Sequence, residues 1–452
     1  MSGNRLLLAC AALLIGSAAM KDIIFIGGGF YLREISQAIC LMVGLYFLPI
    51  SASRAALWVM LPMLGYLLAL AMGATNSINW DFVSLQVLSI AAVLFFGLAL
   101  WNSNPANAEK NYAFLFRATF YILLGVCVAS LAAAVLAPGA AYEIIYGGEI
   151  RFRGVLSKAG WMGASAGMLA GLALFGRAQP VWLRGVAFVV GAACLMLAGA
   201  RTFWIAFAIA SLACCILYFP REWRRFRLVG AAVGLLVVLP VWIVTTVDIG
   251  KLEDLVRFRT VSNLSGRTTL WEESIDAFGQ RPWLGFGLSQ GAVAITGGAD
   301  ESLFASQRTD PRAISRVTVH SGYLQSVLDA GILGTVFYGL LVLGALLRIA
   351  WADGARAYPA AFFFLLFMMI GNFSENVIYA ASTFPAMLFW LLCIFALSAP
   401  MSRRLPARAA TVLDLAAGDA EPAAPAPIPK PRHRPRPLHV RIAEARGAFS
   451  RR

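Results

Sequence analysis

Charge is scarce in this chain. Of its 452 residues, 13% are charged and 60% are hydrophobic, whereas a soluble globular protein has about 25% charged residues. This shortage excludes a soluble enzyme. Metal-binding patterns are also missing, because the sequence has three histidines, no CxxC pair and no DxD triplet. The seven cysteines all fall inside apolar runs, where cysteine commonly acts as a small buried hydrophobe. We therefore expect neither a metal site nor a disulfide framework.

Long apolar runs dominate what is present. At about 20 residues per crossing, they predict an all-α, polytopic membrane protein with about 12 transmembrane helices. The runs are Leu6–Met20, Ile35–Leu48, Ala55–Met72, Phe82–Trp101, Ala118–Ala137, Trp161–Phe175, Val186–Gly199, Thr202–Phe219, Leu228–Val247, Tyr323–Leu347, Pro359–Gly371 and Ile378–Ser398. The first, rather short, run is interpreted as a membrane helix and not as a cleavable signal peptide. One or two of the shorter runs would serve equally well as half-helices.

Basic residues in the short loops predict the orientation, because cytoplasmic loops retain Lys and Arg. With the N-terminus inside, the inner segments hold twelve: Arg5, Arg54, Lys110, Arg117, Arg177, Arg184, Arg221, Arg224, Arg225, Arg227, Arg348 and Arg356. The outer loops hold six: Lys21, Arg33, Arg151, Arg153, Lys158 and Arg201. We therefore expect both termini in the cytoplasm.

These patterns divide the chain into four parts. Residues 1–247 form membrane helices 1–9, residues 248–319 a periplasmic loop subdomain, and residues 320–398 membrane helices 10–12. Residues 399–452 form a basic tail, which is too poor in apolar residues to fold alone and is expected to be disordered in the cytoplasm. The net charge of +14 is largely explained by this tail, which holds 11 of the 37 Lys and Arg residues. Its expected partner is anionic membrane lipid and not nucleic acid.

One histidine stands apart from the tail. His320 lies where the long loop meets the tenth apolar run, within VHSGYLQSVLDAGILG. Histidine changes its charge near neutral pH and can accept a proton from a hydroxyl, which suits a general base. A capping or interfacial histidine is the alternative. Glu375 and Asn376, in GNFSENVIY, are expected at the outer end of a helix, where they would orient His320 or a sugar hydroxyl.

Four arginines of the outer segments form a candidate anion site. Arg201 stands alone between two apolar runs, and Arg267 falls in the first turn of a predicted helix, where the helix dipole disfavours a cation. Arg151 and Arg153 lie in another outer loop. If they converged, they would bind a doubly charged, oxygen-rich anion such as a pyrophosphate without a metal. The alternative is that they snorkel or face lipid phosphate.

In combination, four motifs resemble the O-antigen ligase and polysaccharide polymerase superfamily. They are ARTFW, SGRTTLW, RPWLGFG and HSGYLQSVLDAG. The resemblance implies a GT-C-like membrane glycosyltransferase of the bacterial inner membrane, with its active site facing the periplasm. It further implies that Arg201 and Arg267 clamp the pyrophosphate, and that His320 acts as the base or orients the acceptor. Relatives commonly place a His-X-Asn-like pair near residues 157–160, whereas this chain has Ser, Lys, Ala and Gly there.

The resemblance implies a substrate and leaves two reactions open. The donor would be an undecaprenyl-pyrophosphate-linked oligosaccharide, which needs no cofactor, and a single displacement would invert the anomeric centre. The spacing of the motifs looks slightly more like polymerases that join exopolysaccharide or O-antigen repeats, the acceptor then being another glycan. The alternative is an O-antigen ligase, whose acceptor is the lipid A-core. A transporter of lipid-linked glycan is a third hypothesis, against which stand the nearly uncharged helices and the lack of a visible repeat.

Overall fold

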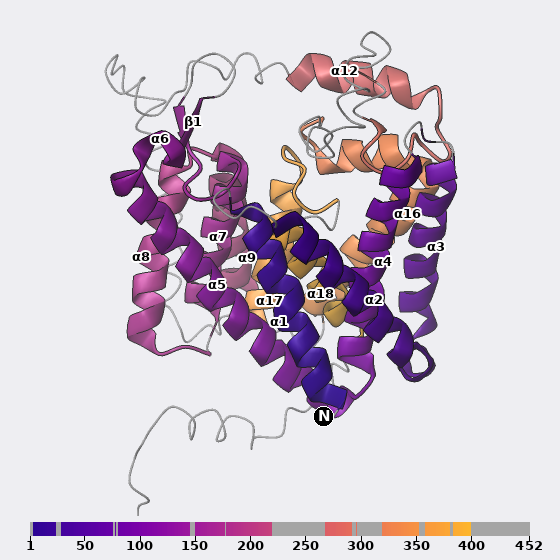
Figure 1. The fold of residues 1–452 in the computed structure, drawn as a ribbon, viewed down its shortest axis with the longest axis horizontal. Helices are drawn as coiled ribbons and strands as arrows, with labels where there is room; N and C mark the ends of the chain where they lie inside the picture. Colours follow the sequence, from indigo (N-terminus) through magenta and orange to yellow (C-terminus); the bar gives the residue numbers. More distant parts are fainter. Residues whose placement is uncertain are drawn as a thin grey trace, which may run out of the picture. The chain divides into compact units, whose positions relative to one another are not determined.

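The computed structural model describes residues 3–23, 29–75, 77, 80–144, 150–176, 178–218, 267–291, 295, 319–351, 358–379 and 383–398. Within these ranges the chain is almost entirely helical (Figure 1). The strands found there are β1 (Tyr142–Ile144) and β2 (Ile150–Phe152), which pair antiparallel in a small hairpin. The predicted all-α class is confirmed.

Eleven of the twelve predicted apolar runs correspond to helices. They are α1 (Gly3–Asp22), α2 (Gly29–Arg54), α3 (Leu57–Thr75), α4 (Trp80–Asn102), α5 (Ala108–Leu136), α7 (Ala159–Phe175), α8 (Val181–Leu197), α9 (Arg201–Tyr218), α16 (Gly322–Trp351), α17 (Pro359–Gly371) and α18 (Phe384–Ser398). Shorter elements are η1 (Pro105–Asn107), α6 (Pro138–Ala141) and α12 (Arg267–Phe278). The predicted ninth run at 228–247 and the predicted tail at 399–452 lie outside the described residues.

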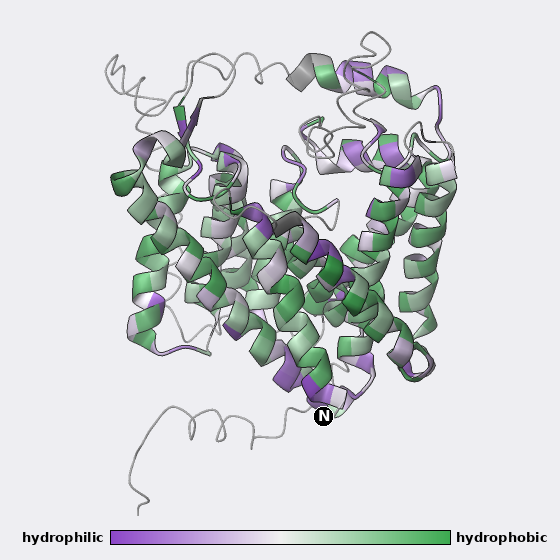
Figure 2. Cartoon of the chain, in the orientation of Figure 1, coloured by the Kyte–Doolittle hydropathy of each residue, from purple (hydrophilic) through white to green (hydrophobic). Residues whose placement is uncertain are grey.

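Helix length and polarity fit a bilayer. Among the described residues, seven helices are long and apolar enough to cross a membrane, and α7, α8, α17 and α18 are apolar but shorter. Apolar residues cover most of the helix surfaces, and polar residues gather at helix ends and on α12 (Figure 2). The chain is therefore a multi-pass membrane protein.

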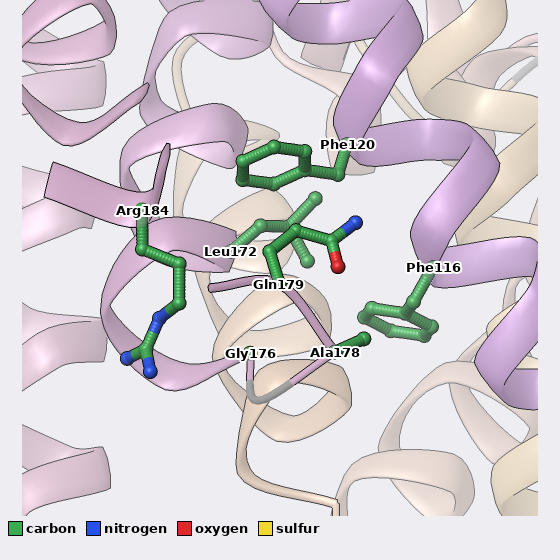
Figure 3. A pocket seen from close by; sticks show the side chains of 7 residues that line it. All are labelled: Phe116, Phe120, Leu172, Gly176, Ala178, Gln179 and Arg184. Atoms are coloured by element: carbon green, nitrogen blue, oxygen red, sulfur yellow. The ribbon is translucent and has the colours of Figure 1, made fainter. Parts of the chain in front are cut away.

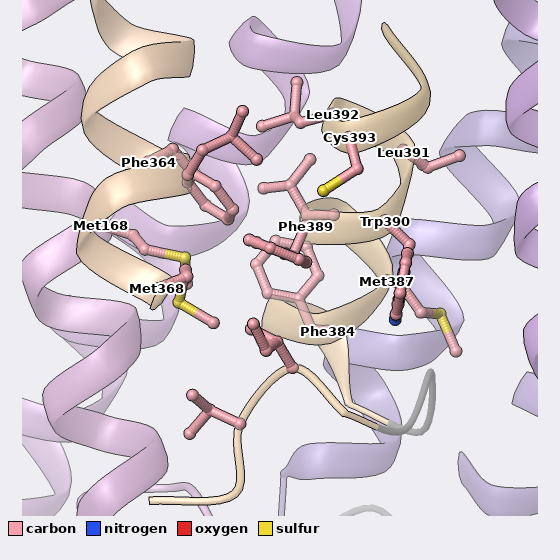
Figure 4. Close-up of a cluster of buried hydrophobic side chains, with 14 of the residues drawn as sticks. Met168, Phe364, Met368, Phe384, Met387, Phe389, Trp390, Leu391, Leu392 and Cys393 are labelled. Carbon is pink, nitrogen blue, oxygen red and sulfur yellow. The ribbon is translucent and has the colours of Figure 1, made fainter. Parts of the chain in front are cut away.

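The centre of the fold is α18. Every residue from Phe384 to Leu397 is buried, as expected for a helix that is apolar on all sides. Its side chains meet those of α7 and α17, including Met168, Phe364 and Met368 (Figure 4). A helix of only 15 residues is therefore stable at this position, because it is surrounded by protein and not by lipid.

Glycine spacing explains how α7 packs into this centre. Gly163, Gly167 and Gly171 repeat every four residues and lie on one helix face. A Cβ at Gly167 would lie 2.4 Å from the Phe367 ring, and one at Gly171 would lie 1.9 Å from the Phe363 ring. The bare backbone of α7 thus lets the phenylalanines of α17 approach closely.

Contacts at the helix ends show that the bundle has two distinct ends. At one end, Asp22 at the close of α1 accepts a hydrogen bond from the Phe384 amide at the start of α18, over 3.0 Å. The middle and later part of α18 pack against the end of α4, where the Trp101 indole donates to the Leu391 carbonyl and its ring lies 4.8 Å from the Phe395 ring. Helices α1 and α18 therefore run in opposite directions, so the start of α1 and the end of α18 share one end of the bundle.

Helix α16 departs from the predicted continuous helix. It is broken at Gly331, which has φ 62° and ψ −167°. A Cβ at this position would lie 2.3 Å from the Trp283 carbonyl group. The glycine therefore permits a bend against the segment that follows α12. A Cβ at Gly334, three residues on, would lie 2.3 Å from the Ala330 side chain across the break and at an ordinary contact distance, 3.5 Å, from Ala69 of α3.

Candidate active site

His320 is held in an uncommon backbone conformation just before α16. Its φ is 52°, in the left-handed region that few residues with a Cβ adopt. The Ser321 hydroxyl accepts the Leu324 amide over 3.4 Å, and its carbonyl accepts the Gln325 amide over 2.8 Å. Ser321 therefore acts as the N-cap of α16. His320 stands outside the helix, with 42% of its side chain exposed.

The chain after α17 folds back onto the start of α16. The Gly322 amide donates to the Asn372 carbonyl over 2.9 Å. The Asn372 side chain accepts from the amides of Val377 and Ile378, each over 3.2 Å, and donates to the Tyr338 hydroxyl over 3.3 Å. A Cβ at Gly322 would lie only 2.0 Å from the Asn372 side-chain oxygen. Glycine is required here because the Asn372 side chain occupies the place that a Cβ would take.

This contact brings Glu375 beside His320. The distance from Glu375 Oε2 to His320 Nδ1 is 3.8 Å, and the Glu375 side chain is 24% exposed. A Cβ on Gly160, in the first turn of α7, would lie 3.6 Å from the same oxygen. Segments that are far apart in the sequence thus meet at one acidic group: the start of α16, the loop after α17 and the start of α7.

Arg201 opens α9 next to the same loop. Gly199, with φ 62°, makes the turn from α8 into α9, and Arg201 is half-buried. Thr202 is hydrogen-bonded through its hydroxyl to the hydroxyl of Ser374, the neighbour of Glu375. The structure therefore places the start of α9, and with it Arg201, at the loop that carries Glu375.

Helix α12 is seated on the residue before His320. The Trp271 indole donates to the Val319 carbonyl over 2.9 Å. Ala277 of α12, Val319 and Leu328 form a small buried apolar cluster. Arg267 is the first residue of α12, one helical turn before Trp271, and its side chain lies outside the described part of the structure. The helix that carries Arg267 is thus fastened beside His320.

Comparison with known proteins agrees with the resemblance drawn from the four motifs. Residues 186–339 match the family model described as O-antigen ligase. The resemblance to the O-antigen ligase and polymerase superfamily is confirmed. The matched region holds Arg201, Arg267 and His320, whereas Glu375 and the β1–β2 hairpin lie outside it. No curated protein matches the chain significantly. The match supports a membrane enzyme of O-antigen ligase and polymerase type, a family whose substrates are lipid-linked glycans.

Arg151 and Arg153 lie at the β1–β2 hairpin, outside the residues matched by the family model. Arg151 lies in β2 opposite Glu143 of β1. The Glu143 carboxylate accepts the first amide of α7, that of Ala159, over 2.8 Å. Arg153 donates through Nε to the Ala140 carbonyl over 3.0 Å. The hydrogen bonds of Glu143 and Arg153 therefore serve to anchor the hairpin, and the predicted substrate role of Arg151 and Arg153 stays a prediction.

Other cations gather on the side of the site formed by α7. Lys158 precedes α7 and lies over the Trp161 ring at 5.6 Å, and Lys21 of α1 lies over the same ring at 5.9 Å. Asn376 follows Glu375 and is half-buried. Residues 157–160 thus place the bare backbone of Gly160 next to Glu375, with Lys158 two residues before it.

A separate small pocket lies away from this site. It has a volume of about 20 Å³ and is lined by Phe116, Phe120 and Arg184, among others (Figure 3). Arg184 donates to the carbonyls of Ala173 and Leu174 at the end of α7, over 2.8 and 2.9 Å. The pocket has room for about one water molecule, so it cannot hold a sugar, and Arg184 serves to cap α7.

Sequence reasoning missed several residues that build the candidate site. Gly160, Thr202 and Ser374 are common residue types in a membrane protein, and each is significant only through its spatial neighbour. Trp271 lies in the helix predicted to begin near Arg267 and had no role assigned to it, whereas its indole fastens α12 to Val319. The usable signal was the spacing of glycines beside polar residues in HSGYLQ and GNFSEN, which marks places where two backbones approach.

Proposed function

We propose that this protein is a glycosyltransferase of the bacterial inner membrane. It transfers an undecaprenyl-pyrophosphate-linked glycan to an acceptor hydroxyl at the periplasmic face, and thereby joins the repeat units of an exopolysaccharide or O-antigen. The observation that carries the proposal is the meeting of His320, Glu375 and the starts of α9 and α12 at one end of the bundle. The match to the O-antigen ligase family supports the same class of reaction.

His320 acts as the general base in this proposal. The acceptor oxygen attacks the anomeric carbon and forms the new glycosidic bond, while the bond from that carbon to the pyrophosphate oxygen breaks. The hydroxyl proton passes to the imidazole. Glu375, 3.8 Å from Nδ1, orients the ring so that its other nitrogen faces the acceptor, as a carboxylate does in a base–orienter pair. One displacement inverts the anomeric configuration.

Arg201 and Arg267 stabilise the leaving group. The undecaprenyl pyrophosphate departs with added negative charge, and guanidinium groups bind such oxygens in pairs. Each charge-assisted hydrogen bond contributes about 1.5 to 3 kcal/mol. Two arginines therefore provide enough electrostatic stabilisation for a departing diphosphate without a metal, because the charge develops next to groups that are already oriented.

The distribution of basic residues supports a periplasmic site. Arg5 at the start of α1, Arg54 at the end of α2 and Arg348 near the end of α16 all lie at the helix ends remote from His320. Lys110 and Arg184, near the starts of α5 and α8, add to the same end. The short inner segments hold twelve Lys and Arg residues against six in the outer loops. Because cytoplasmic ends retain basic residues, this count supports a periplasmic position for the end that bears His320.

The O-antigen ligase reaction is the second candidate, and the family description favours it. Ligase and polymerase share the donor and differ in the acceptor. The purified protein in liposomes, given lipid-linked repeat alone, should produce longer lipid-linked glycans if it is a polymerase. A product that forms only when lipid A-core is added would establish the ligase instead. Transport of lipid-linked glycan across the bilayer without any new glycosidic bond would reject both.

A further inference from the structure

A buried carboxylate lies in α16, away from the residues of the proposed mechanism. Asp329 is 0% exposed. Its Oδ2 accepts the Ser289 amide over 2.6 Å, and its Oδ1 accepts the Gly291 amide over 2.6 Å and the Gln325 side-chain amide over 3.0 Å. All three partners are N–H donors, which suits an ionised carboxylate. Burial of such a group is costly unless it is fully hydrogen-bonded, so this arrangement requires a reason.

Gln325 extends the hydrogen bonds from Asp329 to the neighbour of His320. Its side chain is buried, and its Oε1 accepts the Val319 amide over 3.3 Å. The Val319 carbonyl in turn accepts the Trp271 indole of α12. A continuous chain of hydrogen bonds therefore runs from the 289–291 segment through Asp329 and Gln325 to Val319. We call Gln325 and Asp329 the α16 relay.

The backbone around the relay shows what it fastens. The segment after α12 attaches to α16 on both sides of the break at Gly331. The Phe286 amide donates to the Leu328 carbonyl over 2.9 Å, and the Ile332 amide donates to the Pro282 carbonyl over 2.8 Å. The RPWLGFG motif is thus the segment that fits into the bend of α16, and Asp329 closes the attachment with its side chain.

We propose that Gln325 and Asp329 are positioning residues for the transfer reaction. They hold His320 and α12 at fixed positions on α16, although neither touches the reacting atoms. His320 needs such support because its left-handed backbone is unfavourable for a residue with a Cβ. This proposal rests on the proposed function, since it concerns the placement of the base and of the helix that begins with Arg267.

Near-isosteric exchanges separate this role from simple filling of the core. In Asp329→Asn, the amide nitrogen must face at least one of the three N–H donors, so at least one hydrogen bond is lost. In Gln325→Glu, a second carboxylate oxygen replaces the donor 3.0 Å from Asp329 Oδ1. The double variant restores a donor–acceptor pair between the two positions and leaves only one loop amide unpaired.

The expected activities follow from this pairing. Each single variant should lose about 10- to 100-fold in turnover, because a shift of about 1 Å in a catalytic group costs up to about 100-fold. The double variant should recover activity above the Gln325→Glu single variant, in which carboxylate oxygens at the two positions face each other. Asn111→Asp is the matched control: it alters an equally buried amide that donates to the Leu100 carbonyl at the other end of the bundle, so turnover per folded protein should stay at the wild-type level.

Amide hydrogen exchange tests the relay without reference to turnover. In both single variants, exchange should rise about tenfold in the peptides that span 286–291 and 319–324, as expected for the loss of one buried hydrogen bond. Unchanged exchange in both peptides, or wild-type turnover in both single variants, would overturn the relay. If exchange rises but the wild-type protein forms no glycosidic bond with any acceptor, the proposed function fails and the relay stands as the structural link between α12 and α16.

Discussion

The conformation of His320 allows its chemical role and its structural cost to be measured separately. A residue with a Cβ loses about 1 to 2 kcal/mol in the left-handed region, whereas glycine adopts φ 52° freely. The greater freedom of glycine in the unfolded chain offsets about 0.5 to 1 kcal/mol of this gain. We therefore expect His320→Gly to be about 1 kcal/mol more stable than His320→Ala. Both variants remove the imidazole, so both should lose about 100- to 10,000-fold in transfer activity.

Three variants in one assay complete the test. His320→Asn retains a side chain that tolerates the left-handed region but cannot act as a base, so it should fold as well as the wild type and be inactive. Thermal unfolding in detergent gives the stabilities, and extension of lipid-linked glycan by the purified protein gives the activities. Activity above one tenth of the wild-type value in any of the three would refute the base assignment. Equal stability of the Gly and Ala variants would refute the conformational argument.

Three further predictions concern the surroundings of His320. Glu375→Gln should lower turnover about tenfold or more while the protein stays folded in the membrane, because a neutral amide orients the imidazole less firmly; wild-type turnover would contradict this. Gly322→Ala should destabilise the protein by about 1 to 3 kcal/mol, because its Cβ would lie 2.0 Å from the Asn372 side chain. Gly339→Ala in the same helix is the control: its Cβ would meet nothing within 4 Å, so it should not destabilise the protein. Thermal unfolding distinguishes the two variants. Arg267→Ala should abolish glycan transfer without loss of protein from the membrane, and a defined reaction that proceeds at the wild-type rate would exclude its role in the clamp.

Hydropathy alone was sufficient to predict the positions of most helices. Helices α4, α7 and α17 begin and end within two residues of the predicted runs, because the bilayer or the apolar core selects continuous apolar sequence. The helix predicted to have Arg267 in its first turn is confirmed as α12 for a similar reason, since its apolar residues recur at helical spacing. The break in α16 was not predicted, because a glycine within an apolar run is equally compatible with close helix packing and with a bend.

The site was predictable only in part. His320 was singled out because a lone histidine at a helix start is unusual in an apolar chain, and Glu375 because it ends a helix on the same side. Arg153 drew attention by its charge, yet its guanidinium is hydrogen-bonded to the Ala140 carbonyl of α6. Gln325 and Asp329 were not singled out at all. Within a sequence they are ordinary polar residues one helical turn apart, and nothing local reveals what they bind.

The amino-acid sequence by itself determined the membrane helices, their alternating direction and the residue types able to perform glycan transfer. These properties depend on apolar length and local spacing, which a reader of the sequence can measure. Only the tertiary structure decided which groups meet: Glu375 with His320, Thr202 with Ser374, and Asp329 with the loop after α12. Such pairings depend on how bare glycine backbones allow distant segments to approach, and that geometry exists only once the helices have packed.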